Sequence, residues 1–290
     1  MRGDADTAGE GGAGAEAVPW STHRVVLLPD RVVKTYRPGH AAARAREVRA
    51  LRLLAVHAPG IAPVLLEHGA SRPGALTMSR LPGTPLRGRP LGAPELHAWA
   101  AALRTVHTAL PPPELAAMPL RPGHQRAVTE RLRRWYARPA DRPRPPVVRR
   151  ALDAGRAWLA GAPPGVTGDA PPSGVTPCFG PGDGNAANYL GDGHRVRLVD
   201  FEESGRSDRA WEIAEITEHV GGWVAEPVDV PALLRACALT PAETARLADC
   251  RRLLALVWLF LLAADDPARP RNPPGTAERQ AHRLQVLLES

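Results

Sequence analysis

The sequence predicts an α+β fold in which a small N-terminal lobe, built on an antiparallel sheet with one helix, precedes a larger and mainly helical lobe. Short β-branched runs are concentrated in the first 80 of the 290 residues. Helical periodicity dominates after the turn that follows Arg80, Leu81-Pro-Gly-Thr-Pro85. A hydrophobic content of 44% supplies enough apolar side chains for a core of this size.

The N-terminal lobe is predicted from a hairpin pattern, a helical stretch and two further strand-like runs. Two β-branched runs flank Pro29-Asp30, which is typical of a turn between paired strands. An Ala/Arg/Leu stretch then shows apolar residues at helical spacing and stops at Pro59-Gly60. We expect strand, strand, helix, strand and strand over residues 25–28, 31–36, 40–57, 62–68 and 75–80.

The second lobe is predicted to be helical with one long loop. Thr240-Pro-Ala-Glu243 is a capping box with proline at the first helical position, so it should open a long helix that ends near residue 264. Nine of the seventeen residues in 161–177 are glycine or proline, which predicts a loop. Further helices are expected over residues 93–110, 125–137 and 147–159, and from residue 276 onward.

The chain carries no sequence signal for a membrane or an oxidising compartment. Residues 1–17 are rich in Gly, Ala and acids without an apolar core, so we expect a disordered tail rather than a signal peptide or anchor. The longest apolar run, residues 253–264, is too short to span a bilayer. Three cysteines without metal-like spacing indicate a reduced, cytoplasmic setting.

The net charge of +7 is concentrated in one segment. Residues 121–150 contain ten arginines and two acidic residues, so the remainder of the chain is nearly neutral. Trp135 and Tyr136 are the only aromatic residues in that segment, and no nucleic-acid-binding motif accompanies it. A solvated helix face or a substrate-facing patch therefore explains the segment better than a contact with nucleic acid or an anionic surface does.

One basic residue stands apart from the others. Of 37 Lys and Arg residues, Lys34 is the single lysine, and it lies within a β-branched run. A compact ammonium suits one phosphate oxygen or one carboxylate, whereas arginine presents a planar fork. A chain that uses arginine almost everywhere retains this lysine either by chance at the surface or because a site requires an ammonium group.

Residues 178–203 place three polar side chains around a predicted hairpin. Asp192-Gly193 is a strong signal for a two-residue turn, and strand-like residues flank it. A hairpin returns its two ends to one place, so Asn188 before it and Asp200 after it should lie close together. Asp183 precedes Asn188 by five residues in a glycine-rich loop.

These three residue types in this order suit phosphoryl transfer. The reaction needs hard oxygen ligands for magnesium and a carboxylate that orients the acceptor hydroxyl. Asn188 and Asp200 would supply the metal ligands, and Asp183 the carboxylate. The alternative is that they are ordinary turn residues, because Asp, Asn and Gly favour loops for conformational reasons.

The same residues resemble the aminoglycoside phosphotransferase and choline kinase branch of the protein-kinase-like fold. The resemblance spans roughly residues 20–265 and rests on 183–188, on Val199-Asp-Phe-Glu202 and on the segment 205–214. It implies that Asp183 is the catalytic carboxylate and that Asn188 and Asp200 ligate magnesium. It also implies that Lys34 contacts the α- and β-phosphates of ATP, with Glu47 as the helix glutamate that holds it.

This resemblance implies a single kinase-like domain and an activity. Residues 18–83 would form the nucleotide-binding lobe and hinge, with adenine near residues 79–81, and residues 84–290 the helical lobe with the catalytic loop and metal site. We expect ATP- and magnesium-dependent transfer of phosphate to a hydroxyl of a small molecule. A protein acceptor fits less well, because only a short segment separates Phe201 from Trp211.

The chain departs from the family pattern at three places. Pro181 stands where the family has a histidine, and Glu212 where it has an aspartate. No glycine-rich loop precedes Lys34, so donors of Ser21 and Thr22 are the candidates to cover the phosphates. These departures motivate an alternative, a catalytically idle kinase-like nucleotide-binding module.

The sequence leaves the charge of the acceptor open. Six acids between residues 202 and 218 would suit a cationic acceptor such as an aminoglycoside. The arginine-rich segment 121–150 would instead attract an anionic or phosphorylated one. His107 and His219 fit structural roles better than catalytic ones. The oligomeric state is not readable from the sequence.

Overall fold

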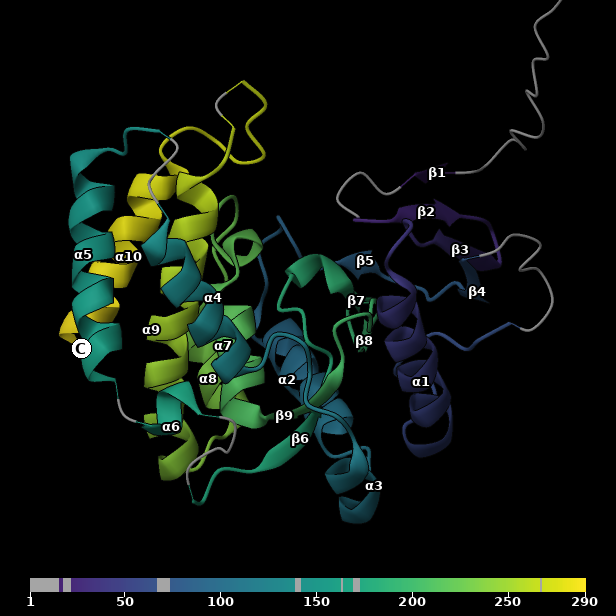
Figure 1. The fold of residues 1–290 in the computed structure, drawn as a ribbon. Helices are drawn as coiled ribbons and strands as arrows, with labels where there is room; N and C mark the ends of the chain where they lie inside the picture. Colours follow the sequence, from purple (N-terminus) through teal and green to yellow (C-terminus); the bar gives the residue numbers. More distant parts are fainter. Residues whose placement is uncertain are drawn as a thin grey trace, which may run out of the picture.

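The computed structural model describes residues 16–17, 22–66, 74–138, 142–162, 164–168, 173–266 and 268–290. A small sheet with one helix lies at one side of the molecule, and a larger group of helices lies at the other (Figure 1). The predicted fold class, a kinase-like α+β arrangement of two lobes, is confirmed.

The first lobe is a four-stranded antiparallel sheet in the order β1-β2-β3-β4. β3 is central, so Lys34 pairs with Val25 on one side and with Leu76 on the other. The predicted hairpin is confirmed, with Leu28 N donating to Arg31 O at 2.8 Å. The elements of this lobe are β1 (Glu16–Ala17), β2 (Arg24–Leu27), β3 (Arg31–Thr35), α1 (Ala41–His57) and β4 (Ala75–Ser79).

Two expectations for this lobe are modified. Most of the expected tail, residues 1–15, lies outside the described residues, and Glu16 and Ala17 pair with β2. Within the described part of 62–68, a single bridge from Leu65 to Met78 replaces the predicted strand. Pro63 has no N–H to donate, so a regular ladder cannot run through that residue. The remainder of that predicted strand, 67–68, lies outside the described residues.

A second, three-stranded sheet lies between the two lobes (Figure 1). It consists of β5 (Thr84–Pro85), β7 (Tyr189–Gly191) and β8 (Val196–Leu198), in the order β5-β7-β8. The predicted hairpin around Asp192-Gly193 is confirmed by the β7–β8 pairing. Asp192 Oδ1 accepts from the backbone N of Arg195 at 2.8 Å, which closes the turn.

The helical lobe is organised around one long, buried helix. α9 (Pro241–Ala263) packs against five other helices. Its predicted capping box is confirmed: Glu243 N donates to Thr240 Oγ1 at 3.2 Å, and Thr240 N donates to Glu243 Oε2 at 2.9 Å. The other helices are α2 (Ala93–His107), α3 (Pro112–Ala117), α4 (Gln125–Ala137), α5 (Pro146–Gly161), α6 (Pro164–Thr167), α7 (Arg209–Glu218), α8 (Val230–Cys237) and α10 (Thr276–Glu289). The short α6 lies inside the segment predicted as a loop.

A two-stranded pair supports the loop that carries Asp183. β6 (Pro177–Gly180) leads into this loop and pairs antiparallel with β9 (Gly205–Asp208). Asp208 ends β9 and caps α7 by accepting from Trp211 N at 2.9 Å. Two short 3₁₀ helices, η1 (Ala186–Asn188) and η2 (Val220–Gly222), follow the loop and α7 respectively. Within the described ranges, no helix is long and apolar enough to cross a membrane.

Candidate active site

The β7–β8 hairpin brings Asn188 and Asp200 together, as the sequence predicts. Tyr189 pairs with Leu198, and one step further out Val199 N donates to Asn188 O at 2.9 Å. Asp200 therefore follows the hairpin beside Asn188. Its φ of 67° lies in the left-handed region, which non-glycine residues seldom adopt. Such outliers persist where the surrounding contacts fix the backbone.

Asp183 faces the same point from its loop. Its Oδ2 accepts from Asn188 Nδ2 at 2.8 Å, and its Oδ1 accepts from Asn185 N at 2.9 Å. The side chain is 37% exposed, so one edge of the carboxylate is open to an incoming molecule. Burial of the remainder, followed by the negative charge of Asp200, raises the pKa of Asp183. The two hydrogen bonds oppose that shift because they stabilise the ionised form.

Lys34 meets three carboxylates from the opposite lobe and from its own. Its Nζ lies 2.8 Å from oxygens of Glu47, Asp200 and Glu202. The residue is 3% exposed. Burial alone would lower the pKa of Lys34, but the carboxylates outweigh it and raise that pKa well above its usual value. The single lysine is therefore a buried, charged group that links β3 to Asp200, the predicted metal ligand.

Glu47 is the predicted helix partner of Lys34, and the structure places it there. It lies on α1, is 1% exposed, and also accepts from the hydroxyl of Tyr36. Its second oxygen, Oε1, accepts from the backbone N of Phe201 at 3.4 Å. Glu47 thus connects α1 both to Lys34 and to the backbone directly after Asp200.

The structure adds Glu202 and His23 to this cluster, which the sequence reasoning did not include. His23 Nδ1 accepts from Arg37 N at 3.3 Å, and its Nε2 lies 3.0 Å from Glu202 Oε2. Glu202 lies two residues after Asp200, between β8 and β9 and outside any strand, so strand periodicity gave no signal for it. Of the candidates to cover phosphates, Ser21 lies outside the described residues, and Thr22 is exposed.

The second buried cation near the site, Arg121, was also missed. It donates to Glu212 Oε1 at 3.0 Å and to the carbonyl oxygen of Gly182, and it lies 3.0 Å from Glu215 Oε1. Glu212 Oε2 in turn accepts from Gly182 N at 3.1 Å. The peptide groups on both sides of Gly182 are therefore held, one residue before Asp183. A Cβ at Gly182 would lie 2.1 Å from the backbone oxygen of Glu203, so only glycine fits.

The Arg121–Glu212 pair holds the backbone directly after Pro181. Pro181 cannot hydrogen bond through a side chain, and the Arg121–Glu212 pair fixes the next residue instead. Arg121 belongs to the arginine-rich segment that the sequence analysis interprets as a solvated helix face or a substrate-facing patch, because a charge count does not report burial. At 3% exposed, it belongs to the interior.

His219 lies against the open edge of Asp183. Its Nδ1 accepts from Gly221 N at 3.0 Å, and its Nε2 lies 3.8 Å from Asp183 Oδ1. Burial, followed by the charge of Arg87, lowers the pKa of His219 to about 3. The ring is therefore neutral with its proton on Nε2, and its edge contacts Trp258 at a centroid distance of 4.6 Å.

The donor set suits a hard divalent cation. Asn188 uses its amide nitrogen on Asp183, so its amide oxygen remains available as a ligand. Asp200 is 28% exposed and directs one oxygen to Lys34, which leaves the other. Oxygens of Glu47, Asp200 and Glu202 also lie within 4.8 Å of one another, but these three carboxylates converge on Lys34 Nζ, so the ligands that remain for a metal are Asn188 and the second oxygen of Asp200. All of these are oxygen donors, the type that magnesium prefers.

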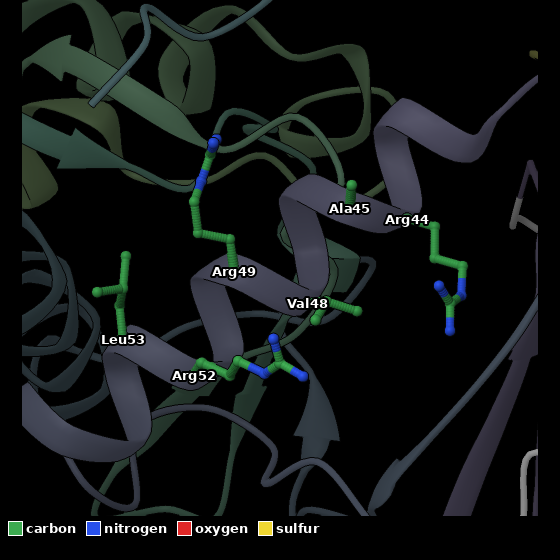
Figure 2. A pocket seen from close by; sticks show the side chains of 6 residues that line it. All are labelled: Arg44, Ala45, Val48, Arg49, Arg52 and Leu53. Atoms are coloured by element: carbon green, nitrogen blue, oxygen red, sulfur yellow. The ribbon is translucent and has the colours of Figure 1, made fainter. Parts of the chain in front are cut away.

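A separate cavity of about 600 Å³ runs along α1 (Figure 2). Its three arginine side chains point in different directions, and Arg44 Nε donates to Ala75 O at 3.1 Å. Because the polar groups do not converge, this cavity does not rival the Lys34–Asp183 site. Its lining comes entirely from α1: Arg44, Ala45, Val48, Arg49, Arg52 and Leu53.

Fold and geometry together define a kinase-like phosphotransferase class. A sequence profile of the phosphotransferase enzyme family (APH) matches residues 18–247. The chain belongs to this family. No curated protein sequence matches the chain significantly.

Solved structures share the fold at low sequence identity. A choline/ethanolamine kinase family protein from Mesorhizobium loti is 20% identical, with 98% of this chain and 90% of that chain covered and a TM-score of 0.65. Choline kinase LicA from Streptococcus pneumoniae is 15% identical, with 95% and 93% covered and a TM-score of 0.58. The GDP complex of aminoglycoside 2'-phosphotransferase-IIIa is 14% identical, with 95% and 91% covered and a TM-score of 0.61.

Proposed function

We propose that this protein is an ATP- and magnesium-dependent phosphotransferase that acts on a hydroxyl group of a small molecule. The observation that carries this proposal is a pair of contacts, from Lys34 to Asp200 at 2.8 Å and from Asn188 to Asp183 at 2.8 Å, which the backbone hydrogen bond from Val199 N to Asn188 O brings side by side. These contacts bring together an ammonium group that would bind phosphate, two oxygen donors that would bind magnesium, and the Asp183 carboxylate. Structural neighbours carry GDP, AMP or ATP, which supports a nucleotide substrate.

The ammonium group of Lys34 would bind the phosphates of ATP. The ammonium now faces three carboxylates, and one of these positions would be shared with a phosphate oxygen when nucleotide binds. Asn188 and Asp200 would hold magnesium, which supplies neutralisation of phosphate charge when bound. Glu47 keeps Lys34 in place throughout, because it is buried on α1.

Asp183 would orient the acceptor and take its proton. The acceptor oxygen forms a bond to the γ-phosphorus while the bond from that phosphorus to the β-phosphate oxygen breaks, and ADP leaves. The hydroxyl proton passes to Asp183 Oδ1, the oxygen on the side that faces His219. Asn188 and the backbone N of Asn185 hold the carboxylate in its orientation.

The same proposal assigns parts of the chain to roles. Residues 18–83 form the nucleotide-binding lobe and hinge, and residues 84–290 the lobe with the catalytic loop and metal site. The three cysteines, Cys178, Cys237 and Cys250, are free and buried. Free thiols are the usual state in a reducing compartment, so we place the protein in the cytoplasm.

The test replaces the carboxylate without changing its size. We expect Asp183→Asn to lower phosphoryl transfer by about 10²–10⁴-fold, because the amide cannot accept the proton. ATP consumption with a panel of hydroxyl compounds measures this, and thermal shift with ATP and magnesium should show unchanged nucleotide binding. Asp153→Asn, at a 70% exposed residue of α5, is the matched control.

Two outcomes would contradict the proposal in different ways. Retained transfer by Asp183→Asn would remove Asp183 from the mechanism. Absence of a magnesium-dependent thermal shift in the unmodified protein, together with no ATP consumption, would favour the catalytically idle module instead.

A further inference from the structure

The acids that would suit a cationic acceptor are already paired within the protein. Six acidic side chains lie between residues 202 and 218, and each has a basic partner within 3.5 Å. The pairs are Glu202 with Lys34 and His23, Glu203 with Arg46, Asp208 with Arg246, Glu212 and Glu215 with Arg121, and Glu218 with Arg251 and Arg283.

This pairing changes the electrostatic argument about the acceptor. A carboxylate that already has a buried cationic partner would have to give it up in order to bind a substrate amine, which would leave that buried cation without a compensating charge. Part of the arginine-rich segment is consumed in the same way, since Arg121 binds two of the six acids. These six acids therefore do not form a free acidic wall.

A basic side chain, Arg87, lies near enough to Asp183 and His219 for the charges to interact. It follows β5, and its Nε lies 3.2 Å from the point that a Cβ of Gly221 would occupy. Asn185 Oδ1 lies 3.2 Å and His219 Nδ1 lies 3.1 Å from the same point. Three polar side chains from three separate segments therefore converge around Gly221, beside the Asp183 loop. A side chain at Gly221 would force them apart.

The charge of Arg87 interacts with both Asp183 and His219. Burial lowers the pKa of Arg87, and the carboxylate of Asp183 opposes that change. The positive charge of Arg87 contributes to keeping His219 neutral. Arg87 as a whole remains partly exposed.

We propose that the acceptor is a hydroxyl compound that also carries an anionic group, a carboxylate or a phosphate, and that Arg87 binds this group. This inference rests on the phosphotransferase function proposed above. The acceptor hydroxyl would lie to one side of Asp183 Oδ1 and His219 Nε2, which are 3.8 Å apart, donating to the first and accepting from the N–H of the second. The guanidinium of Arg87 is a planar fork that matches both carboxylate and phosphate oxygens.

The test compares compounds that differ only in the anionic group. Ribose is paired with ribose 5-phosphate, and glycerol with glycerate and glycerol 3-phosphate; choline and kanamycin are the cationic probes. ATP consumption gives kcat and KM for each, and thermal shift without nucleotide gives direct binding. We expect at least one anionic compound to exceed its neutral partner about 10-fold or more in kcat/KM, and the carboxylate and phosphate arms to show which group is preferred.

Variants of Arg87 then assign the effect to this side chain. We expect Arg87→Gln to raise the ratio of KM for the preferred anionic compound to KM for its neutral partner by about 10–100-fold. The ratio removes any effect that the lost charge has on both compounds through Asp183 and His219. Arg87→Lys keeps the charge without the fork and should fall between the two; it also serves if Arg87→Gln does not fold. Arg150→Gln, at an exposed residue of α5, is the control for general loss of positive charge.

The outcomes separate this proposal from the one on which it depends. Preference for choline or kanamycin, or an unchanged ratio of the two KM values in Arg87→Gln, overturns the anionic acceptor and leaves the phosphotransferase standing. The same conclusion follows if the protein binds magnesium and ATP, yet no anionic compound is turned over or shifts its melting temperature. Absence of a magnesium- and ATP-dependent shift in the unmodified protein contradicts the phosphotransferase function itself.

Discussion

Two buried cations, Lys34 and Arg121, flank the candidate site from opposite lobes, and both are 3% exposed. Lys34 reaches from β3 to three carboxylates. Arg121 precedes α4 and binds two carboxylates and the carbonyl oxygen of Gly182. One is an ammonium with only side-chain partners, and the other is a guanidinium that also holds the backbone.

The difference between these partners separates a binding group from a structural one. Asp200, a partner of Lys34, is 28% exposed and can share the ammonium with a phosphate. Glu212, the corresponding partner of Arg121, is 2% exposed and also holds Gly182 N. A point charge tolerates exchange of partners, whereas a planar fork with fixed partners holds one geometry. We therefore expect Lys34 to govern activity and Arg121 to govern stability.

The largest expected effect comes from removing the structural cation. Arg121→Met should destabilise the protein by about 3–5 kcal/mol, because it leaves two buried carboxylates without their partner. Urea unfolding monitored by tryptophan fluorescence measures this difference. Arg133→Met, at an exposed residue of α4, is the matched control and should change stability by less than about 0.5 kcal/mol. Equal losses of unfolding free energy in the two variants would show that the contacts of Arg121 do not stabilise the fold.

The next effect concerns the dependence of stability on pH. Burial raises the pKa of Glu215 to about 7, from an ordinary value of 4.5, against the lowering influence of Arg121 and with further raising by Glu212 and Asp183. Between these values the folded state holds a proton that the unfolded chain has released. The Glu215 contribution to stability is therefore present below pH 4.5 and is lost as pH rises toward 7.

Glu215→Gln removes that contribution. We expect the difference in unfolding free energy between the two proteins to change by roughly 1–3 kcal/mol between pH 5 and 7, with the unmodified protein falling relative to the variant. Because His107 and His219 have lowered pKa values of about 4 and about 3, they act in the opposite direction below pH 6.5, so the two proteins must be compared at each pH. Parallel stability curves would contradict the assignment to Glu215.

The smallest effect on stability should come from Lys34→Arg. The positive charge is kept, so we expect a cost of roughly 1 kcal/mol from the larger side chain. Turnover should nevertheless fall by about 10²–10³-fold, since the fork cannot reproduce the position of the ammonium. Steady-state ATP consumption and unfolding are measured on the same preparation. Full activity of Lys34→Arg would show that Lys34, like Arg121, has a structural role rather than a role in turnover.

The same contrast explains what the sequence could predict. Lys34 was identifiable because it is the single lysine, and Asn188 and Asp200 because Asp192-Gly193 defines a hairpin that brings its ends together. These signals are local in the chain or compositional. Glu47 as the partner of Lys34 followed from the resemblance to a family, and the distance of 2.8 Å agrees with it.

Arg121 was not identifiable, because its role depends on contacts far along the chain. Glu212 lies 91 residues away, and nothing in the sequence around Arg121 marks it as buried. The same reason applies to His23, whose partner Glu202 belongs to the other lobe. The strand expected at 62–68 failed for a local reason, since Pro63 interrupts the ladder and only a single bridge forms.

The burial of Lys34 has a consequence for the chemistry of the whole chain. Apart from the amino terminus, the protein has one primary amine, and folding leaves that residue 3% exposed. Amine-directed reagents, amine cross-linkers and enzymes that attach groups to lysine therefore find no accessible lysine side chain on the native surface. Covalent labelling at Lys34 reports opening of the fold rather than its outer face.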